Sequence, residues 1–93
     1  STYLFVALAD MPWVAPTTLH VLRAALEQAL EGSPDVIVQP VHAGRPGHPV
    51  GFAGRCRDAL TTLAGDVGAR AVLERFPELL IKVAVDDPGV LRD

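Results

Sequence analysis

Three apolar stretches of the chain have the pattern of β-strands. Residues 3–9 (YLFVALA) form a continuous run without a charged position, which is typical of a strand covered on both faces, as in a parallel sheet. Residues 36–38 (VIV) are β-branched and lie between prolines, and residues 79–85 (LLIKVAV) are again rich in β-formers. We therefore expect three strands in this order.

A helical repeat separates the first two expected strands. Within residues 17–31, leucine recurs at helical spacing, at Leu19, Leu22, Leu26 and Leu30. The repeat predicts an amphipathic helix that buries this stripe of leucines. Two further helices are expected, one at residues 55–63 and one that begins near Asp66 and ends near Arg75.

Glycine and proline mark the remaining connections. Residues 43–54 hold four glycines and two prolines, a density that excludes a helix and suits backbone that approaches a ligand. Residues 49–52 favour a short strand within this stretch, and residues 86–89 (DDPG) favour a turn, after which residues 90–91 start another strand. The order of strand, helix, strand, glycine-rich loop, helix, helix and strand predicts a three-layer α/β domain.

Composition excludes several classes of function. Eight basic residues against eleven acidic ones give a net charge of −3, which leaves no source for the phosphate neutralisation that nucleic-acid binding needs. No apolar run approaches the ~20 residues that span a bilayer, so we expect no membrane partner. The single cysteine, Cys56, forms no internal disulfide, and no Cys/His cluster has zinc spacing. A reducing, cytoplasmic setting is therefore expected.

Asp10 is the first candidate for chemistry. It follows the first expected strand, at the carboxyl end, where open α/β sheets place their ligands. Its carboxylate is the hard oxygen ligand that Mg²⁺ prefers, so the position suits Mg²⁺ beside nucleotide phosphates. An aspartate that caps a turn before Pro12 gives the same pattern, and the residues leave both interpretations open.

Two further segments offer hydrogen-bond donors to an anion. Residues 44–49 (GRPGHP) combine flexible backbone with Arg45 and His48, although His48 also suits a loop that hydrogen-bonds to itself. Residues 65–70 (GDVGAR) place Arg70 one turn into an expected helix whose start suits an anion. A plain helix connection with Asp66 as the N-cap fits the second segment as well.

Three segments in this order resemble the MobA-like nucleotidyltransferases, particularly the molybdenum cofactor cytidylyltransferases. They are residues 8–12 (LADMP), 47–50 (GHPV) and 65–70 (GDVGAR). The resemblance extends over essentially the whole chain and implies a three-layer α/β/α, Rossmann-like nucleotidyltransferase fold of the GT-A-like type.

The resemblance also implies roles for individual residues. The family's first segment typically reads L-A-D-Q-P, and its aspartate binds the Mg²⁺ that bridges the nucleotide phosphates, which makes Asp10 the catalytic metal ligand. Gly47, His48, Asp66 and Arg70 become acceptor-binding candidates, the acceptor being a phosphorylated pterin, molybdopterin, in the cofactor enzymes. Their individual roles stay open. The implied reaction is attack of the acceptor phosphate on the α-phosphorus of CTP or GTP, with release of pyrophosphate. Related transferases act on sugar phosphates or phospholactate instead.

The sequence departs from the family pattern in three places. Met11 replaces the common glutamine, the glycine-rich segment L-A-A-G-x-G-x-R-x-G has no match, and a D-I-D-T-P-type segment is met only by its first residue, Asp93. We therefore expect residues 1–93 to be the C-terminal, acceptor- and metal-binding half of one domain, inactive alone. Half a sheet exposes strand edges, which favours a homo-oligomer. The alternative is a non-catalytic α/β binding or assembly module.

Overall fold

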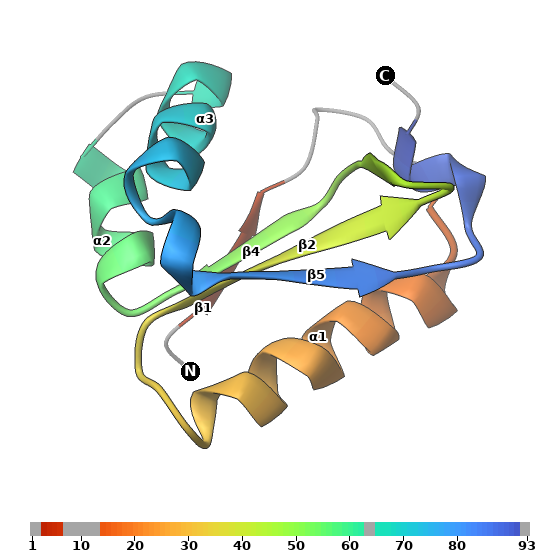
Figure 1. The fold of residues 1–93 in the computed structure, drawn as a ribbon, viewed down its shortest axis with the longest axis horizontal. Helices are drawn as coiled ribbons and strands as arrows, with labels where there is room; N and C mark the ends of the chain where they lie inside the picture. The colour runs from red at the N-terminus through yellow and green to blue at the C-terminus, as the bar shows by residue number, and fades with distance from the viewer. Residues whose placement is uncertain (1–2, 7–13, 63–64, 92–93) are drawn as a thin grey trace.

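The computed structural model describes residues 3–6, 14–62 and 65–91. Its elements are, in chain order, β1 (Tyr3–Val6), α1 (Pro16–Leu30), β2 (Val36–His42), β3 (Arg45–Pro46), β4 (Val50–Ala53), α2 (Arg55–Thr62), α3 (Gly65–Arg75), the 3₁₀ turn η1 (Pro77–Leu79), β5 (Leu80–Ala84) and the 3₁₀ turn η2 (Pro88–Leu91). Figure 1 shows them arranged around one sheet. The three predicted helices and the predicted strands at 36–38, 49–52 and 79–85 are confirmed, while residues 7–9 of the first predicted strand lie outside the described residues.

The sheet is mixed, which corrects the expected parallel setting of the first strand. β4 lies between β1 and β2 and is antiparallel to both, and β5 is parallel to β2 on its other side. β1, β2 and β5 consequently run in the same direction, and β3 forms a short hairpin with the end of β2. An apolar run indicates that a strand is buried, but not which strand lies beside it. The partner of the first strand could therefore not be predicted.

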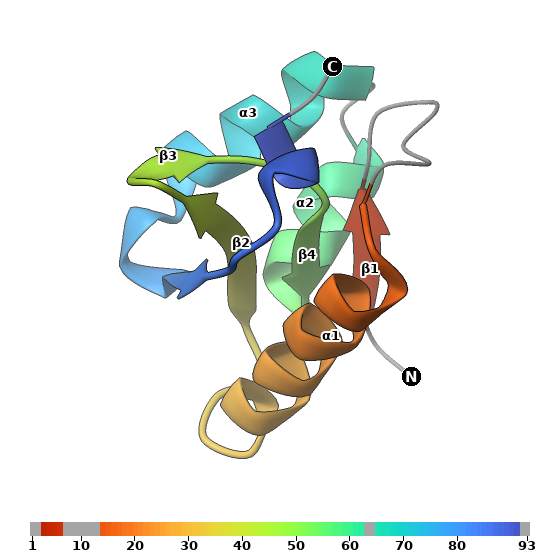
Figure 2. The ribbon, with the colours of Figure 1, turned by 90° about the vertical axis from the view of Figure 1, so that its right-hand side faces the viewer.

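The predicted three layers are present. Val36 and Val38 of β2 pack with Leu22 and Leu26 of α1 on one face of the sheet. Ile37 points to the other face, where it packs with side chains of α2 and α3. Successive strand residues alternate between faces, so β2 serves two cores at once. Figure 2 shows α1 in front of the sheet and α2 and α3 behind it.

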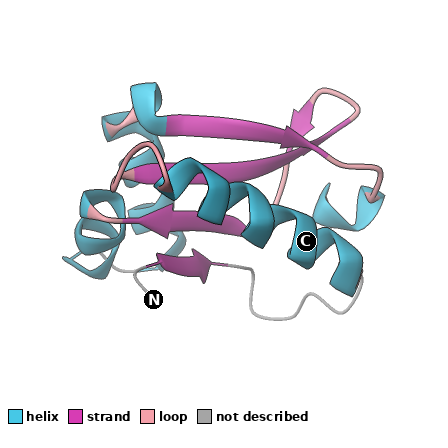
Figure 3. Cartoon of the chain, turned by 90° about the horizontal axis from the view of Figure 1, so that it is seen from below, coloured by secondary structure: helices cyan, strands magenta, loops and turns pink. Residues whose placement is uncertain are grey.

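The helix α1 begins at Pro16, whose fixed φ suits the first turn. Leu22 and Leu26 are fully buried, as predicted, but Leu19 is 44% exposed. The buried position of the first turn belongs to Thr18 instead, because its hydroxyl donates to the Asp87 carboxylate at 2.7 Å. The buried stripe of leucines on α1 is therefore shorter than the repeat predicts. Figure 3 shows α1 lying across one face of the sheet.

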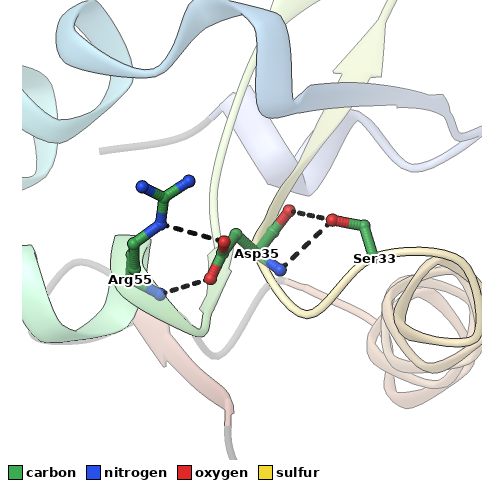
Figure 4. A network of polar contacts seen from close by, with 3 residues as sticks. All are labelled: Ser33, Asp35 and Arg55. Carbon is green, nitrogen blue, oxygen red and sulfur yellow. Dashed lines mark hydrogen bonds and ion pairs between the residues drawn. The ribbon is translucent and has the colours of Figure 1, made fainter.

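A carboxylate joins the start of β2 to the start of α2. Asp35 accepts the N–H of Arg55 at 2.8 Å and its Nε at 3.0 Å (Figure 4). The Ser33 hydroxyl donates to the backbone carbonyl of Asp35 and accepts the backbone N–H of Asp35. The Arg55 backbone N–H, more than the guanidinium, holds the pKa of Asp35 below its ordinary value. Because 73% of the Arg55 side chain is exposed, we attribute the stabilising role chiefly to the capping of α2.

A second carboxylate joins the end of the chain to α1. Oδ2 of Asp87 accepts the N–H of Ala15 at 2.9 Å and the Thr18 hydroxyl, and Oδ1 accepts the N–H of Gly89 at 2.9 Å. These donors, led by the Ala15 N–H, lower the pKa of Asp87, and the nearby His42 adds to the effect. The carboxylate is therefore bound most strongly in its charged form.

The strand expected at residues 90–91 is wrong, because these residues belong to the 3₁₀ turn η2. The Asp87–Gly89 hydrogen bond and the proline at position 88 start the turn locally. Val90 is fully buried, and its carbonyl accepts the N–H of His48 at 2.8 Å, so it joins no strand ladder.

The hairpin between β2 and β3 contains a strained residue. His42 and Arg45 are paired across a two-residue turn in which Ala43 has φ 54° and Gly44 has φ 77°. Two positive φ angles in a two-residue hairpin are the geometry of a type I′ turn, which favours Asn-Gly. Ala43 therefore occupies a conformation that alanine disfavours.

We expect Ala43→Asn to raise the free energy of unfolding by up to about 1 kcal/mol, since asparagine tolerates this conformation. Gly44→Ala is the matched opposite change: its Cβ meets nothing within 4 Å, so only the backbone strain is added. We expect it to cost about 1–2 kcal/mol. Urea titrations of both variants measure the effects, and a less stable Ala43→Asn variant would contradict the assignment of strain.

Asp87→Asn should lower the stability at neutral pH by about 1–2 kcal/mol, because it removes a charged acceptor from Ala15, Thr18 and Gly89. The folded chain holds the pKa of Asp87 below that of the unfolded chain. The contribution is therefore present above a pH of about 4 and is lost as the pH falls through the folded-state pKa. The free energies of unfolding of the wild type and of Asp87→Asn should therefore become equal in acid. Asp86→Asn is the control, and a pH-independent difference for Asp87→Asn would refute the charge-based account.

Candidate functional site

Gly47 and His48 lie in the loop between β3 and β4, against η2. The N–H of Gly47 donates to the carbonyl of Pro40 at 2.9 Å, and a Cβ at Gly47 would overlap the carbonyl oxygen of Val90. The close approach that glycine allows is thus to the protein's own backbone. The His48 N–H is likewise bonded to Val90, while its half-buried ring makes no hydrogen bond to another described residue. The side chain of His48, and not this backbone, is the group available to a ligand.

Asp66 and Arg70 lie on α3. The helix begins at Gly65, so Asp66 belongs to its first turn and not to the cap position of the alternative interpretation; its side chain lies outside what the structure describes. Arg70 follows one turn later, and its side chain is exposed. The opposite side of α3 is anchored through Val72 in the core between the sheet and α2. Arg70 therefore carries a positive charge at the end of a long, exposed side chain, on the outer side of a helix that is fixed in the core.

The described acceptor candidates lie on two separate parts of the fold, the loop against η2 and the helix α3. No hydrogen bond or ion pair between described groups connects Gly47 or His48 with Arg70. In Figure 1, α3 lies at the upper left and η2 at the right, and the carboxyl end of β1 lies between them. Figure 2 shows all three toward the same end of the molecule. The elements that carry the candidates, α3 and the loop against η2, thus lie on two sides of the end of β1.

Asp10 and Met11 lie outside the described residues, as does Asp93. Asp10 follows the last residue of β1, Val6, by four positions in the chain. Among the residues that the structure describes, no group of three or more His, Cys, Asp or Glu side chains is arranged to hold a metal ion. Mg²⁺ needs no such cage, because one or two carboxylates with substrate phosphates and water suffice. The donor chemistry of a single carboxylate after β1 therefore fits Mg²⁺.

An open groove of about 370 Å³ lies between the first half of α1 and the connection from β5 to η2. It is lined by Thr17, Thr18, Val21, Ala84, Val85, Asp86 and Asp87. Asp87, which our sequence analysis treated only as part of a turn, already accepts three hydrogen bonds from the chain. A turn of the type Asp-Pro-Gly signals a local bend, but nothing in it signals a partner 72 residues earlier.

The described residues also decide two smaller questions, the reactivity of the cysteine and the presence of a helix that could span a membrane. Cys56 is fully buried, and burial raises the pKa of its thiol, which disfavours the reactive thiolate. Across residues 3–6, 14–62 and 65–91, no helix has the length and apolar character to cross a membrane.

Comparison with known proteins identifies the family. A family model, the MobA-like NTP transferase domain, matches residues 1–80 of the 93-residue chain. Comparison with curated proteins gives no match. The three-layer α/β architecture is compatible with the fold that the resemblance implied. The match covers most of the chain, and the chain therefore belongs to the MobA-like NTP transferase family, with a nucleotidyltransferase-related role.

Proposed function

We propose that the chain acts in the transfer of a nucleotidyl group from CTP or GTP to a phosphorylated acceptor such as molybdopterin. The family match over residues 1–80 carries this proposal. The topology supports this proposal. Asp10 follows β1 in the chain, β1 runs in the same direction as β2 and β5, and α/β sheets bind ligands at the carboxyl ends of such strands. A reaction of nucleoside triphosphates also suits the cytoplasm.

The proposed step is a substitution at phosphorus. An oxygen of the acceptor phosphate forms a bond to the α-phosphorus, the bond from that phosphorus to the bridging oxygen of the β-phosphate breaks, and pyrophosphate leaves with the electron pair. Mg²⁺, when bound, neutralises charge on the phosphates. Asp10 would hold it. No covalent intermediate with the protein is required.

The described candidates would act on the acceptor. The ring of His48 and the exposed guanidinium of Arg70 offer donors to an anionic acceptor, and the guanidinium matches phosphate geometry. Gly47 would act by shape, because its N–H is already bonded to Pro40. Asp66 would lie beside the acceptor as part of the first turn of α3. Positioning and electrostatics thus provide the catalysis.

The test starts with the reading frame before Ser1, which shows whether the glycine-rich segment L-A-A-G-x-G-x-R-x-G is encoded there. Pyrophosphate release is then measured with the natural full-length product, Mg²⁺, CTP or GTP, and molybdopterin. We expect Asp10→Asn to reduce the rate by about 10²-fold or more, because it removes the charge that would hold the metal.

Asp86→Asn is the control, since it removes an exposed carboxylate to which the proposed reaction assigns no role. A wild-type rate in Asp10→Asn would refute the metal assignment. No pyrophosphate release with either nucleotide would refute the transferase proposal for this chain and favour the binding or assembly module.

A further inference from the structure

Residues 85–91, which we call the strap, connect parts of the fold that are distant in sequence. Its first residue is held by the end of β2: the N–H of Val85 donates to the carbonyl of Val41 at 2.9 Å, and Nδ1 of His42 lies 3.0 Å from the carbonyl oxygen of Val85. The strap then passes the start of α1 and ends in η2 beside the loop before β4 (Figure 2).

The hydrogen bonds between the strap and the start of α1, as far as the structure describes them, all go to the side chain of Asp87. Asp87 accepts the N–H of Ala15 and the hydroxyl of Thr18 through Oδ2, and it accepts the N–H of Gly89 through Oδ1. Thr18 is only 7% exposed, while Asp87 is half-buried, so the contact is shielded from water on the side of the helix. One carboxylate thus fixes both the helix start and the bend of the strap.

The contact with the loop before β4 is made by Val90. Its side chain is fully buried, its carbonyl accepts the N–H of His48 at 2.8 Å, and its Cβ would lie 3.0 Å from a Cβ on Gly47. The carbonyl of Asp87 accepts the N–H of Val90 at 3.3 Å, which links the residue that contacts α1 directly to the residue that contacts the loop. No flexible linker separates Asp87 from the residue that seats His48.

We propose that the strap is one mechanical unit in which Asp87, through Val90, positions Gly47 and His48. Asp87 is then a positioning residue for acceptor binding. This functional part rests on the proposed function; the mechanical part does not. Ala15 lies five positions after Asp10 in the chain, so the strap also ties the chain downstream of the proposed metal ligand to the acceptor loop.

The mechanical part is tested by amide hydrogen exchange of the 93-residue chain. In Asp87→Ala, the N–H groups of Ala15 and Gly89 lose their acceptor, but the N–H of His48 keeps its own. We expect exchange at His48 to accelerate about tenfold or more, beyond any change at Phe52 in the central strand, which reports global unfolding. Faster exchange at Ala15 and Gly89 with His48 unchanged relative to Phe52 would overturn the proposal.

Two variants make the test independent of how well Asp87→Ala folds. Asp87→Asn keeps one acceptor oxygen for Ala15 and Thr18, so the exchange rate at the His48 amide should return at least partly to its wild-type value. Gly47→Ala perturbs the other end, because its Cβ would overlap the Val90 carbonyl, and it should accelerate exchange at Ala15. Gly32→Ala is its control, since the nearest atom to the new Cβ is the Ala29 carbonyl oxygen at 3.9 Å. Unchanged exchange at Ala15 in Gly47→Ala would also overturn the strap as a unit.

The functional part is tested with the catalytically complete protein. We expect Asp87→Ala to raise the KM for the acceptor about tenfold, with a smaller effect on the KM for the nucleotide, because the strap touches the acceptor loop. Asp87→Asn, which keeps an acceptor oxygen, should raise the KM for the acceptor less. Equal changes in both KM values would overturn the positioning role. If the wild-type protein releases no pyrophosphate, the proposed function fails, while hydrogen exchange still decides whether the strap exists.

Discussion

The antiparallel strand β4 is the constraint on which the remaining structure depends. It pairs on one side with β1 and on the other with β2, so the sheet is continuous only through it. Its Val50 and Phe52 enter the core under α2 and α3, while Ala53 enters the core under α1. Position 51 of β4 requires glycine, because a Cβ there would lie only 2.7 Å from the ring of Phe5. The direction of β4 also decides where its two connections go: the preceding loop reaches the carboxyl ends of β2 and β5, and α2 starts at the opposite end of the sheet.

Two aspartates complete the connections at these opposite ends. Asp35 accepts the N–H of Arg55 where α2 starts, and Asp87 accepts the N–H of Ala15 before α1. Both carboxylates have a lowered pKa for the same leading reason, a backbone N–H donor. The chain's own carboxylates therefore occupy the positive ends of these two helices, which are elsewhere common anion sites. The starts of α1 and α2 are therefore not open to an external anion, which leaves the start of α3 and side chains such as those of His48 and Arg70 as the candidates.

Much of the layer architecture could be predicted from the sequence, because periodicity reports burial. Leu22 and Leu26 are buried as the repeat predicts, and the helix and strand order is that of a three-layer domain. The pairing of β4 between β1 and β2 could not be read in the same way, since a short apolar segment carries no signal for its neighbours. Leu19 is exposed because a contact between Thr18 and Asp87, 69 residues apart, decides which side of the first turn is buried. Of the candidate site, residue types and segments could be proposed, but their separation on two sides of β1 depends on how the whole chain folds.

The glycine-rich loop shows why a residue's conformational freedom and its chemical role must be separated. The resemblance makes Gly47 a candidate, and a glycine-rich loop suits backbone that approaches a ligand, yet the group that Gly47 approaches is the Val90 carbonyl. Its N–H is bonded to Pro40, and that of His48 to Val90, so neither amide is free for an anion in this structure. The group of the loop that remains for a ligand is the half-buried imidazole of His48, whose backbone N–H is bonded to Val90 of η2. Acceptor recognition in this family member would then depend on how rigidly the end of the chain packs against the loop. The same packing links the loop to α1 through Asp87, so the placement of His48 and the anchoring of the chain at Ala15 depend on one set of contacts.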